Sequence, residues 1–314
     1  MAILTAKVPE EMAGKRFDQC LAEIFPDYSR SKLQSWIKAG RITVNKKSLK
    51  AKDKLDGGEE VVLDAEAEVV MEYEAEDIPL DIVYEDEALL IVNKPAGLVV
   101  HPAVGHWQGT LVNALLNHQV SLKTLPRAGI VHRLDKDTSG LLMVAKTLQA
   151  HNSLSSQLQE RTIVREYLAL VKGWMTAGGT IDEPLGRHPN DRKRHIVRED
   201  GKHAVTHYRL EQRFKRYTLV RVKLETGRTH QIRVHMAYAQ YPLVGDQVYS
   251  GRFQMPANCS EQLEQVLRDF KRQALHATRL GLLHPETNEY CEWEQTVPED
   301  MENLLKVLEQ DELD

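Results

Sequence analysis

An acidic stretch without a single Lys or Arg interrupts this chain of 314 residues. It runs from residue 64 to residue 87, carries eleven Asp or Glu and contains no Gly. A block of like charge repels itself and does not pack into a core, so it is typical of a segment between folded parts. We therefore expect a linker over residues 64–77, between a small domain over residues 13–75 and a larger domain over residues 78–314.

The small first part has the spacing of two short helices followed by two strands. Apolar residues recur at i, i+3, i+4 and i+7 over residues 17–24, and the same spacing begins again over residues 33–37. Gly40 stands where a left-handed residue closes a helix. Strand-like apolar runs follow at residues 42–44 and 61–63. The pattern predicts an α-α-β-β arrangement.

The same small domain is strongly basic. Residues 28–54 carry nine Lys or Arg and one acid, Asp53, although the formal net charge of the whole chain is −5. Nucleic-acid binding depends on a local basic face rather than on the total charge. The domain is therefore compatible with an RNA or DNA partner, and a solvated lysine-rich face is the alternative.

The larger second part mixes strand-like and helical patterns. Strand-like runs lie at residues 82–84, 89–92, 141–145, 162–172, 206–210, 218–226 and 289–293. Helical spacing appears at residues 148–159, 229–240 and 260–270. This irregular mixture predicts an α+β domain with a mixed or antiparallel sheet. Motifs typical of dinucleotide binding, NTP hydrolysis, zinc proteases and nucleophile-elbow esterases are absent from the sequence, so these activities lose support.

A polar loop rich in ionisable side chains, residues 131–141, stands directly before one of the apolar strands. Loops on a rigid sheet are where binding and catalytic residues concentrate. Asp135 is the candidate for chemistry in this loop. The alternative is an ordinary turn, in which Asp135 or Asp137 bonds its own backbone and Arg133 neutralises the charge.

A second polar stretch, residues 224–236, passes from a strand through Gly227 into a helix. Helical spacing places His230 and Arg233 on one face of that helix, so Arg233 can point into a cleft. Its natural partner is a carboxylate. No metal site is expected here, because His230 and His235 are five residues apart and fall on different faces of a helix.

The small domain resembles the S4 RNA-binding domain in residues 16–18, 29–31, 37–45 and 57–61. Lys46 stands where that family usually has Gly, which adds a further cation to the turn. The resemblance implies structured RNA that is held chiefly through its phosphates. The residues expected to contact it lie at the start of the second helix and in the lysine-rich turn: Ser29, Arg30, Lys32, Arg41, Lys46 and Lys47.

The larger domain resembles the RluA-type pseudouridine synthase family. The family's signature is His-Arg-Leu-Asp, two residues and then Thr-Ser-Gly, and it stands without a gap at residues 132–140. Residues 165–171 match the pattern Lys-x-Tyr-x-Ala-x-Val, with Arg165 in place of the Lys. Further family blocks lie at residues 93–98, 226–235, 242–246 and 275–277. The resemblance implies a cofactor-independent isomerase that converts uridine in RNA to pseudouridine.

The resemblance also implies roles for individual residues. Asp135 matches the family's catalytic aspartate, and Arg233 matches the arginine that forms a salt bridge with it. Tyr167 matches an active-site tyrosine that lies against the uracil ring. Arg133 matches the residue that fills the gap left when a base leaves its stack. In the same motifs, the further candidates for RNA contact are His132 and Arg228.

As substrate, the resemblance implies specific uridines of large-subunit (23S) ribosomal RNA, several of them in one stem-loop. The expected partner is this RNA or the assembling 50S subunit, bound by a monomer. Three alternatives stay open. They are a pseudouridine synthase that acts on tRNA, an RNA-binding protein without catalysis, and an unrelated hydrolase that pairs a carboxylate with an arginine.

Nothing in the sequence predicts contact with a membrane. No apolar run approaches the roughly 18 residues that a membrane-spanning helix needs. The first residues lack the basic and apolar regions of a secretory signal. We therefore expect a cytoplasmic location.

Overall fold

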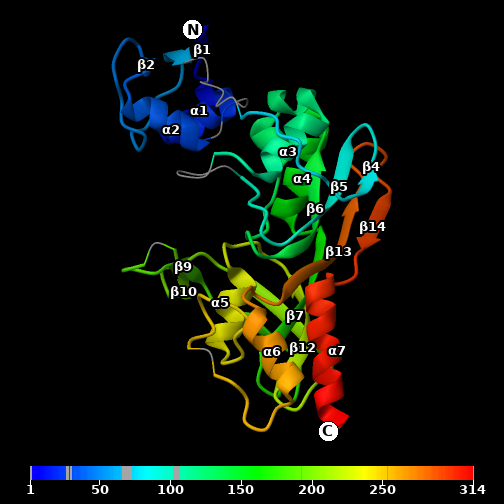
Figure 1. The fold of residues 1–314 in the computed structure, drawn as a ribbon. Coiled ribbons are helices and arrows are strands. Elements are labelled where there is room, and N and C mark those ends of the chain that lie inside the picture. The colour runs from blue at the N-terminus through cyan, green and yellow to red at the C-terminus, as the bar shows by residue number, and fades with distance from the viewer. Residues whose placement is uncertain are drawn as a thin grey trace. The chain divides into compact units, whose positions relative to one another are not determined.

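The computed structural model describes residues 2–25, 28, 30–65, 73–101, 107–191, 193–252 and 254–313. The chain forms two compact units, Met1–Glu72 and Tyr73–Asp314 (Figure 1). The change from the first unit to the second falls within the acidic stretch of residues 64–87. In the described part of the chain, no helix combines the length and the apolar composition needed to cross a bilayer.

The first unit contains the predicted helices and strands in the predicted order, preceded by one more strand. A short 3-10 helix, η1, lies between that extra strand, β1, and the first α-helix. Among the described residues the strand order is β1-β3-β2, with all pairs antiparallel. The elements are β1 (Ala2–Lys7), η1 (Glu10–Met12), α1 (Phe17–Ile24), α2 (Arg30–Lys38), β2 (Ile42–Val44) and β3 (Glu60–Ala65).

Strand β1 makes the first unit start earlier than the expected residue 13. It pairs with β3 from Ala2 opposite Ala65 to Lys7 opposite Glu60. As an edge strand it has one neighbour, and Ile3 is 71% exposed. Residues 3–7 alternate between exposed and half-buried, but the apolar Ile3 is on the exposed side, so the sequence lacks the apolar–polar alternation by which a strand is recognised.

The helices of the first unit bury one apolar face each. Phe17 and Leu21 of α1 and Leu33 of α2 are fully buried, and they pack with Ile42 and Leu63 of the sheet. This is the face that the i, i+3, i+4 spacing predicted. After α2 the backbone of Gly40 has a φ of 71°, the left-handed conformation expected at this position.

The lysine-rich turn after β2 is a tight one. Val44 and Lys47 exchange backbone hydrogen bonds of 2.8 and 2.9 Å, which leaves Asn45 and Lys46 as the two turn residues. Both have positive φ, 47° and 65°, a conformation that favours Gly or Asn. Lys46 therefore takes the strained conformation without being Gly, and its side chain is exposed to solvent.

The second unit is built on one large mixed sheet. Among the described residues its strand order is β4-β5-β6-β13-β7-β12-β11-β8, and β14 also pairs with β13. Only β6 and β13 run parallel among these described pairs. The predicted α+β class with a mixed sheet is confirmed. The strands are β4 (Ile82–Glu85), β5 (Leu89–Lys94), β6 (Ser139–Ala145), β7 (Val164–Lys172), β8 (Gly179–Asp182), β11 (Val205–Arg213), β12 (Tyr217–Leu224), β13 (Leu275–Leu283) and β14 (Tyr290–Glu294).

Helices cover both faces of this sheet. One face carries Leu142 and Val171, which pack with helices α3 and α5. The other face carries Met143, which packs with α4, and Leu170, which packs with α6 and α7. Successive side chains of a strand point to opposite faces, so each strand serves both layers. The helices are α3 (Leu111–His118), η2 (Val120–Thr124), η3 (Pro126–Gly129), α4 (Leu148–Glu160), α5 (Gln231–Tyr238), α6 (Glu261–Asp269) and α7 (Glu299–Leu313).

The remaining strands, β9 (Leu185–Arg187) and β10 (His195–Val197), form an antiparallel hairpin outside the large sheet. The sequence patterns predicted neither this hairpin nor the central strand β13. β13 is buried along most of its length and has His276 and Thr278 among its apolar residues. It therefore lacks the alternation of a half-buried strand.

Candidate active site

The polar loop before β6 is held in place by polar contacts to the neighbouring strand and to its own backbone. Gln273 donates to the hydroxyl of Thr138 at 3.1 Å, and the hydroxyl of Ser139 lies 3.0 Å from Nδ1 of His276. The N–H of Thr138 donates to the carbonyl of Asp135 at 3.1 Å. These contacts fix the loop at the start of β6, where the Asp135 side chain is 16% exposed.

The Thr-Ser-Gly part of the loop motif has a steric reason. Gly140 has a φ of 111°, and a Cβ built there lies 2.2 Å from the carbonyl oxygen of Ala277 on the parallel strand β13. A side chain at this position would force β6 and β13 apart. Gly140 therefore allows the close pairing that sets the position of the loop.

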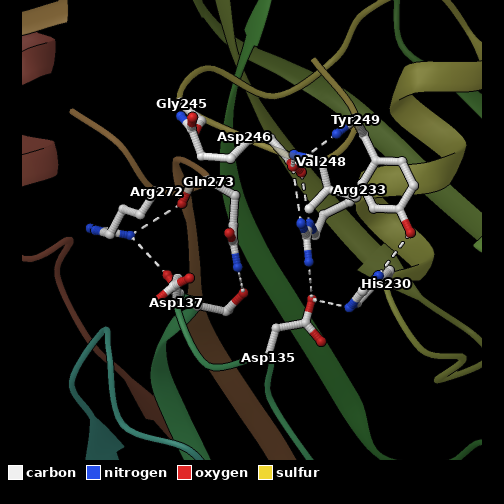
Figure 2. A network of polar contacts seen from close by, with 12 residues as sticks. Asp135, Asp137, His230, Arg233, Gly245, Asp246, Val248, Tyr249, Arg272 and Gln273 are labelled. Atoms are coloured by element: carbon white, nitrogen blue, oxygen red, sulfur yellow. Dashed lines mark hydrogen bonds and ion pairs between the residues drawn. The ribbon is translucent and has the colours of Figure 1, made fainter. Parts of the chain in front are cut away.

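Arg233 reaches Asp135 from helix α5. Its guanidinium is almost buried, with 7% of the side chain exposed, and Nη1 donates to Oδ2 of Asp135 at 3.0 Å (Figure 2). The two polar stretches of the sequence thus meet, and Arg233 has the carboxylate partner that the sequence predicted. Helix α5 begins at Gln231, two residues later than expected, and the described contacts of the Asp135 carboxylate are to other segments rather than to its own backbone.

Asp246 is a second carboxylate on the same guanidinium, and the sequence analysis gave it no role. It accepts from Nε of Arg233 at 2.7 Å and from Nη2 at 2.9 Å. It also accepts the backbone N–H groups of Val248 and Tyr249 at 2.8 and 3.1 Å. Asp246 lies in the family block at residues 242–246, which was the available signal.

The two carboxylates that contact Arg233, Asp135 and Asp246, differ in their electrostatic environment. Burial opposes ionisation of Asp246, but Arg233 and the two N–H groups outweigh burial and lower the pKa of this carboxyl. Burial likewise disfavours the charged form of Arg233, and Asp246 and Asp135 together raise the pKa of its guanidinium above the usual value. Asp246 takes two of the guanidinium hydrogen bonds and Asp135 takes one, so Asp135 keeps lone pairs available for a substrate.

Asp135 and Arg233 line a cavity of about 800 Å³ in the second unit. Its walls include Asp135, Arg233, Tyr167 and the turn that follows β12. Besides Arg233, the arginines of its lining are Arg127, Arg133, Arg161, Arg165 and Arg228. The wall also contains two carboxylates, Asp135 and Glu225, and Glu225 is bonded to Arg161 and His207. The excess of arginines suits a polyanionic substrate.

Tyr167 lies on β7 and lines this cavity, as does the Asp135 loop. Its side chain is 6% exposed, and burial raises the pKa of its phenol, so the hydroxyl keeps its proton at neutral pH. Arg165 is two residues away on the same strand, and burial lowers the pKa of its guanidinium. The Arg165 Nη2 donates to the backbone carbonyl of Glu225 at 3.4 Å, and its Nε is buried without a hydrogen-bond partner in the described part of the chain.

The loop residues expected to contact RNA differ in their environment. Arg133 and Arg228 both line the cavity with exposed side chains. His132 also lines it, but its Nε2 accepts the backbone N–H of Met143 at 3.1 Å. Burial, assisted by the positive charge of Arg165, lowers the pKa of His132 to about 3. The ring is therefore neutral and accepts a hydrogen bond from the backbone of β6. An RNA contact by His132 stays a prediction.

The residues expected to bind RNA in the first unit are only partly described. Ser29 lies outside the described residues, and of Arg30 and Lys32 only the backbone, in α2, is described. The Nη1 atom of Arg41 lies 3.7 Å from Oδ2 of Asp64. The side chains of Lys46 and Lys47 are exposed at the tight turn.

Lys94 is a further residue of the site region to which the sequence analysis gave no role. It is 1% exposed, and its ammonium donates to the carbonyls of Pro95, Leu98 and Lys136 at 2.7, 3.0 and 2.9 Å. Burial lowers the pKa of Lys94 to about 7, although Asp137 and Asp135 oppose this. The ammonium joins the segment after β5 to the loop that carries Asp135, and the family block at residues 93–98 was the available signal.

Known proteins match both units of the chain. The model of the RNA pseudouridylate synthase family matches residues 88–238, and the S4 domain model matches residues 15–61. The chain is 56% identical to "Ribosomal large subunit pseudouridine synthase D" of Pseudomonas aeruginosa over 306 residues, 98% of this chain and 96% of the relative. It is 54% identical to the Escherichia coli K12 protein of the same name over 98% of this chain and 95% of the relative.

Solved structures show the same fold. "Human RNA Pseudouridylate Synthase Domain Containing 1" superimposes with a TM-score of 0.55 at 26% identity, covering 71% of this chain and 86% of that one. "Human RNA Pseudouridylate Synthase Domain Containing 4" gives 0.57 at 24% identity, covering 73% and 92%. With its S4 domain and its near full-length relatives, the chain belongs to the RNA pseudouridylate synthase family and is an isomerase that acts on RNA.

Proposed function

We propose that this pseudouridine synthase modifies uridines of large-subunit ribosomal RNA and uses Asp135 as its catalytic carboxylate. The named target of its bacterial relatives, which are 56% and 54% identical over 98% of this chain, supports the substrate. One observation carries the assignment of Asp135. Its carboxylate, held by Arg233 at 3.0 Å, lines a cavity of about 800 Å³ whose wall carries six arginines. The other carboxylate of the wall, Glu225, is bonded to Arg161 and His207.

The reaction breaks the bond between N1 of uracil and C1′ of the ribose, turns the ring and forms a bond from C5 to C1′. C5 then loses its proton and N1 gains one. The reaction involves no net redox change and no net uptake of water, so we propose no cofactor. An ionised Asp135 can serve in two ways. It acts as a nucleophile on the nucleotide or as a base that removes a sugar proton.

Arg233 and Tyr167 have supporting roles in this proposal. Arg233 favours the ionised form of Asp135 and holds its carboxylate in one orientation. Tyr167 lies on β7 in the same cavity and offers its ring to the face of the uracil. Because burial raises the pKa of Tyr167, its hydroxyl is protonated and is able to donate a hydrogen bond to the ring during its rotation.

The cationic rim of the cavity fits an RNA strand with a flipped nucleotide. Flipping costs a few kcal/mol of stacking free energy, and an exposed side chain that fills the gap offsets part of this cost. Arg133 suits that role, because it stands two residues before Asp135 and is exposed at the cavity. Arg228 at the cavity, and Lys46 and Lys47 in the S4 domain, then contact phosphates.

In this proposal the two units divide the work. The S4 domain, within residues 13–75, holds the RNA, and the domain of residues 78–314 carries out the chemistry. We further propose that the protein acts as a monomer in the cytoplasm, on free ribosomal RNA or on the assembling 50S subunit. Sedimentation of the purified protein tests the first point, and comparison of naked RNA with isolated precursor particles tests the second.

The experiment is pseudouridine mapping on total RNA from cells that carry the wild-type protein, no protein, Asp135→Asn or Asp137→Asn. Asp137 is the matched control, because it lies in the same loop and its described hydrogen bond is made by its backbone carbonyl. We expect specific large-subunit uridines to lose the modification without the protein and in Asp135→Asn, and to keep it in Asp137→Asn. Loss of tRNA sites with ribosomal RNA unchanged would contradict the substrate, and full modification in Asp135→Asn would contradict the mechanism.

A further inference from the structure

His230 has a backbone conformation that its side chain does not favour. It precedes α5 with φ 57° and ψ 20°, the left-handed region, and its side chain makes no capping hydrogen bond to the helix. A residue with a Cβ is strained in this region, and such strain at a site is a sign of a functional constraint. Asn adopts this conformation with less strain, so a change of His230 to Asn removes the imidazole without adding backbone strain.

The imidazole bridges Tyr249 and Asp135. Its Nδ1 lies 2.8 Å from the hydroxyl of Tyr249, and its Nε2 lies 3.9 Å from Oδ2 of Asp135 (Figure 2). That oxygen is the one that accepts from Arg233. The 3.9 Å separation is longer than a hydrogen bond, and contacts of this kind often tighten when substrate binds.

The hydrogen-bond partners indicate which ring nitrogen carries the proton. The hydroxyl oxygen of Tyr249 already accepts the backbone N–H of His195 at 2.9 Å, and its own proton is free to be donated to Nδ1 of His230. Burial lowers the pKa of His230 although Asp135 opposes this, so the neutral ring has one N–H. With Nδ1 as an acceptor, that N–H is on Nε2 and faces the Asp135 carboxylate.

The other end of this chain of contacts is the β9–β10 hairpin. His195 is the first residue of β10, and Arg194 beside it lies with its guanidinium 5.7 Å from the centre of the Tyr249 ring. The hairpin also carries Arg187 and Lys193 with exposed side chains. It is therefore a cationic element whose backbone is directly bonded to the Tyr249 hydroxyl.

We propose that Tyr249 and His230 form one positioning relay, through which the β9–β10 hairpin sets the orientation of the Asp135 carboxylate. RNA phosphates that settle on the hairpin shift the His195 N–H, and Tyr249 and His230 pass this shift to Oδ2 of Asp135. The inference rests on the catalytic role proposed for Asp135. His230 is a positioning residue, because its N–H faces Asp135 and acts through that carboxylate.

Two conservative variants test the relay. Tyr249→Phe removes the hydroxyl and keeps the ring, whose centre is 5.0 Å from the Arg233 guanidinium. His230→Asn relieves the left-handed strain and keeps an acceptor for Tyr249, but its short side chain no longer reaches Asp135. The control is Tyr238→Phe, which alters a tyrosine on α5 that is 52% exposed.

The assay measures pseudouridine formation on total RNA from cells that lack the protein, together with the melting temperature of each variant. We expect kcat to fall about tenfold in each single variant, with KM within about twofold, since misplacing a reacting group by about 1 Å can cost on the order of 100-fold. His230→Asn should melt no lower than the wild type. The double variant should lose at most about twofold more than either single variant, because both break the same relay.

Wild-type kcat in His230→Asn, or effects that multiply in the double variant, would overturn the relay. A variant in which a lower kcat comes together with a lower melting temperature would also overturn it, since that would show a structural role. Asp135→Asn is measured alongside. If it is inactive while His230→Asn is fully active, the relay alone fails, and if Asp135→Asn is active, the proposed function fails with it.

Discussion

The loops that precede β6 and follow α5 each place one carboxylate on Arg233, and the two carboxylates have opposite environments. Asp246 has a fully buried side chain that accepts two guanidinium and two backbone N–H groups. Asp135 has a side chain 16% exposed to a cavity and accepts one guanidinium hydrogen bond. A saturated carboxylate stabilises the fold, whereas a partly satisfied one is free to react. The comparison supports a structural role for Asp246 and the catalytic role proposed for Asp135.

Removal of the saturated carboxylate should have the largest effect on stability. Asp246→Ala leaves the Arg233 guanidinium buried without its bidentate partner, which costs about 3–5 kcal/mol of unfolding free energy. Denaturant unfolding measures this, with Asp135→Ala as the comparison and an expected change below about 1 kcal/mol. Equal losses in the two variants would break the distinction between the carboxylates.

Arg233→Lys should separate geometry from charge. A lysine keeps the positive charge but cannot hold Asp246 with two hydrogen bonds and Asp135 with a third. We expect kcat to fall about 100-fold and the unfolding free energy to fall by about 1–3 kcal/mol. Single-turnover rates and denaturant unfolding check both numbers, and wild-type kcat in this variant would show that a point charge is enough.

The buried His132 ring, in the loop that carries Asp135, should make the stability of the protein depend on pH. The folded-state pKa of His132 is about 3, below the value of about 6.5 for an unfolded histidine. The unfolded chain therefore binds more protons between these values, so this stabilisation is complete above about pH 6.5 and declines as the pH falls toward 3.

Thermal unfolding from pH 7 to pH 4 measures this slope. His132→Gln keeps an acceptor for the Met143 N–H and should remove on the order of 2 kcal/mol of the acid-induced loss. The control is His203→Gln, whose side chain is 54% exposed. If both variants retain the wild-type slope, the neutral, buried state of His132 is contradicted.

The site residues that the sequence predicted are those that lie in short local motifs. Asp135 and Arg233 are recognisable because each stands in a compact polar stretch beside an apolar strand or helix. Asp246 was missed, because its role depends on how the loop after α5 folds back onto Arg233. A tertiary contact of this kind leaves no periodic pattern in the sequence. Tyr249 and His195 were missed for the same reason, since only tertiary contact brings them to His230.

The elements of the fold divide in a similar way. Most strands and several helices were predicted, whereas β8, α3 and β13 were not. In β13, His276 and Thr278 interrupt the apolar residues, so the strand shows neither an alternation nor a continuous apolar run. Helix α7 is a different case. Met301, Leu304 and Leu308 are buried at helical spacing, so the sequence carries a signal for this helix that the sequence analysis did not use.

The most direct test of the central claim is the rate of pseudouridine formation by purified Asp135→Asn protein. The substrate is total RNA from cells that lack the protein, and the affinity for that RNA is measured in parallel. Asn keeps the size of the side chain and removes its charge. We predict wild-type RNA affinity with a rate reduced by at least about 1,000-fold. A rate within about tenfold of the wild type would contradict the assignment of the chemistry to Asp135.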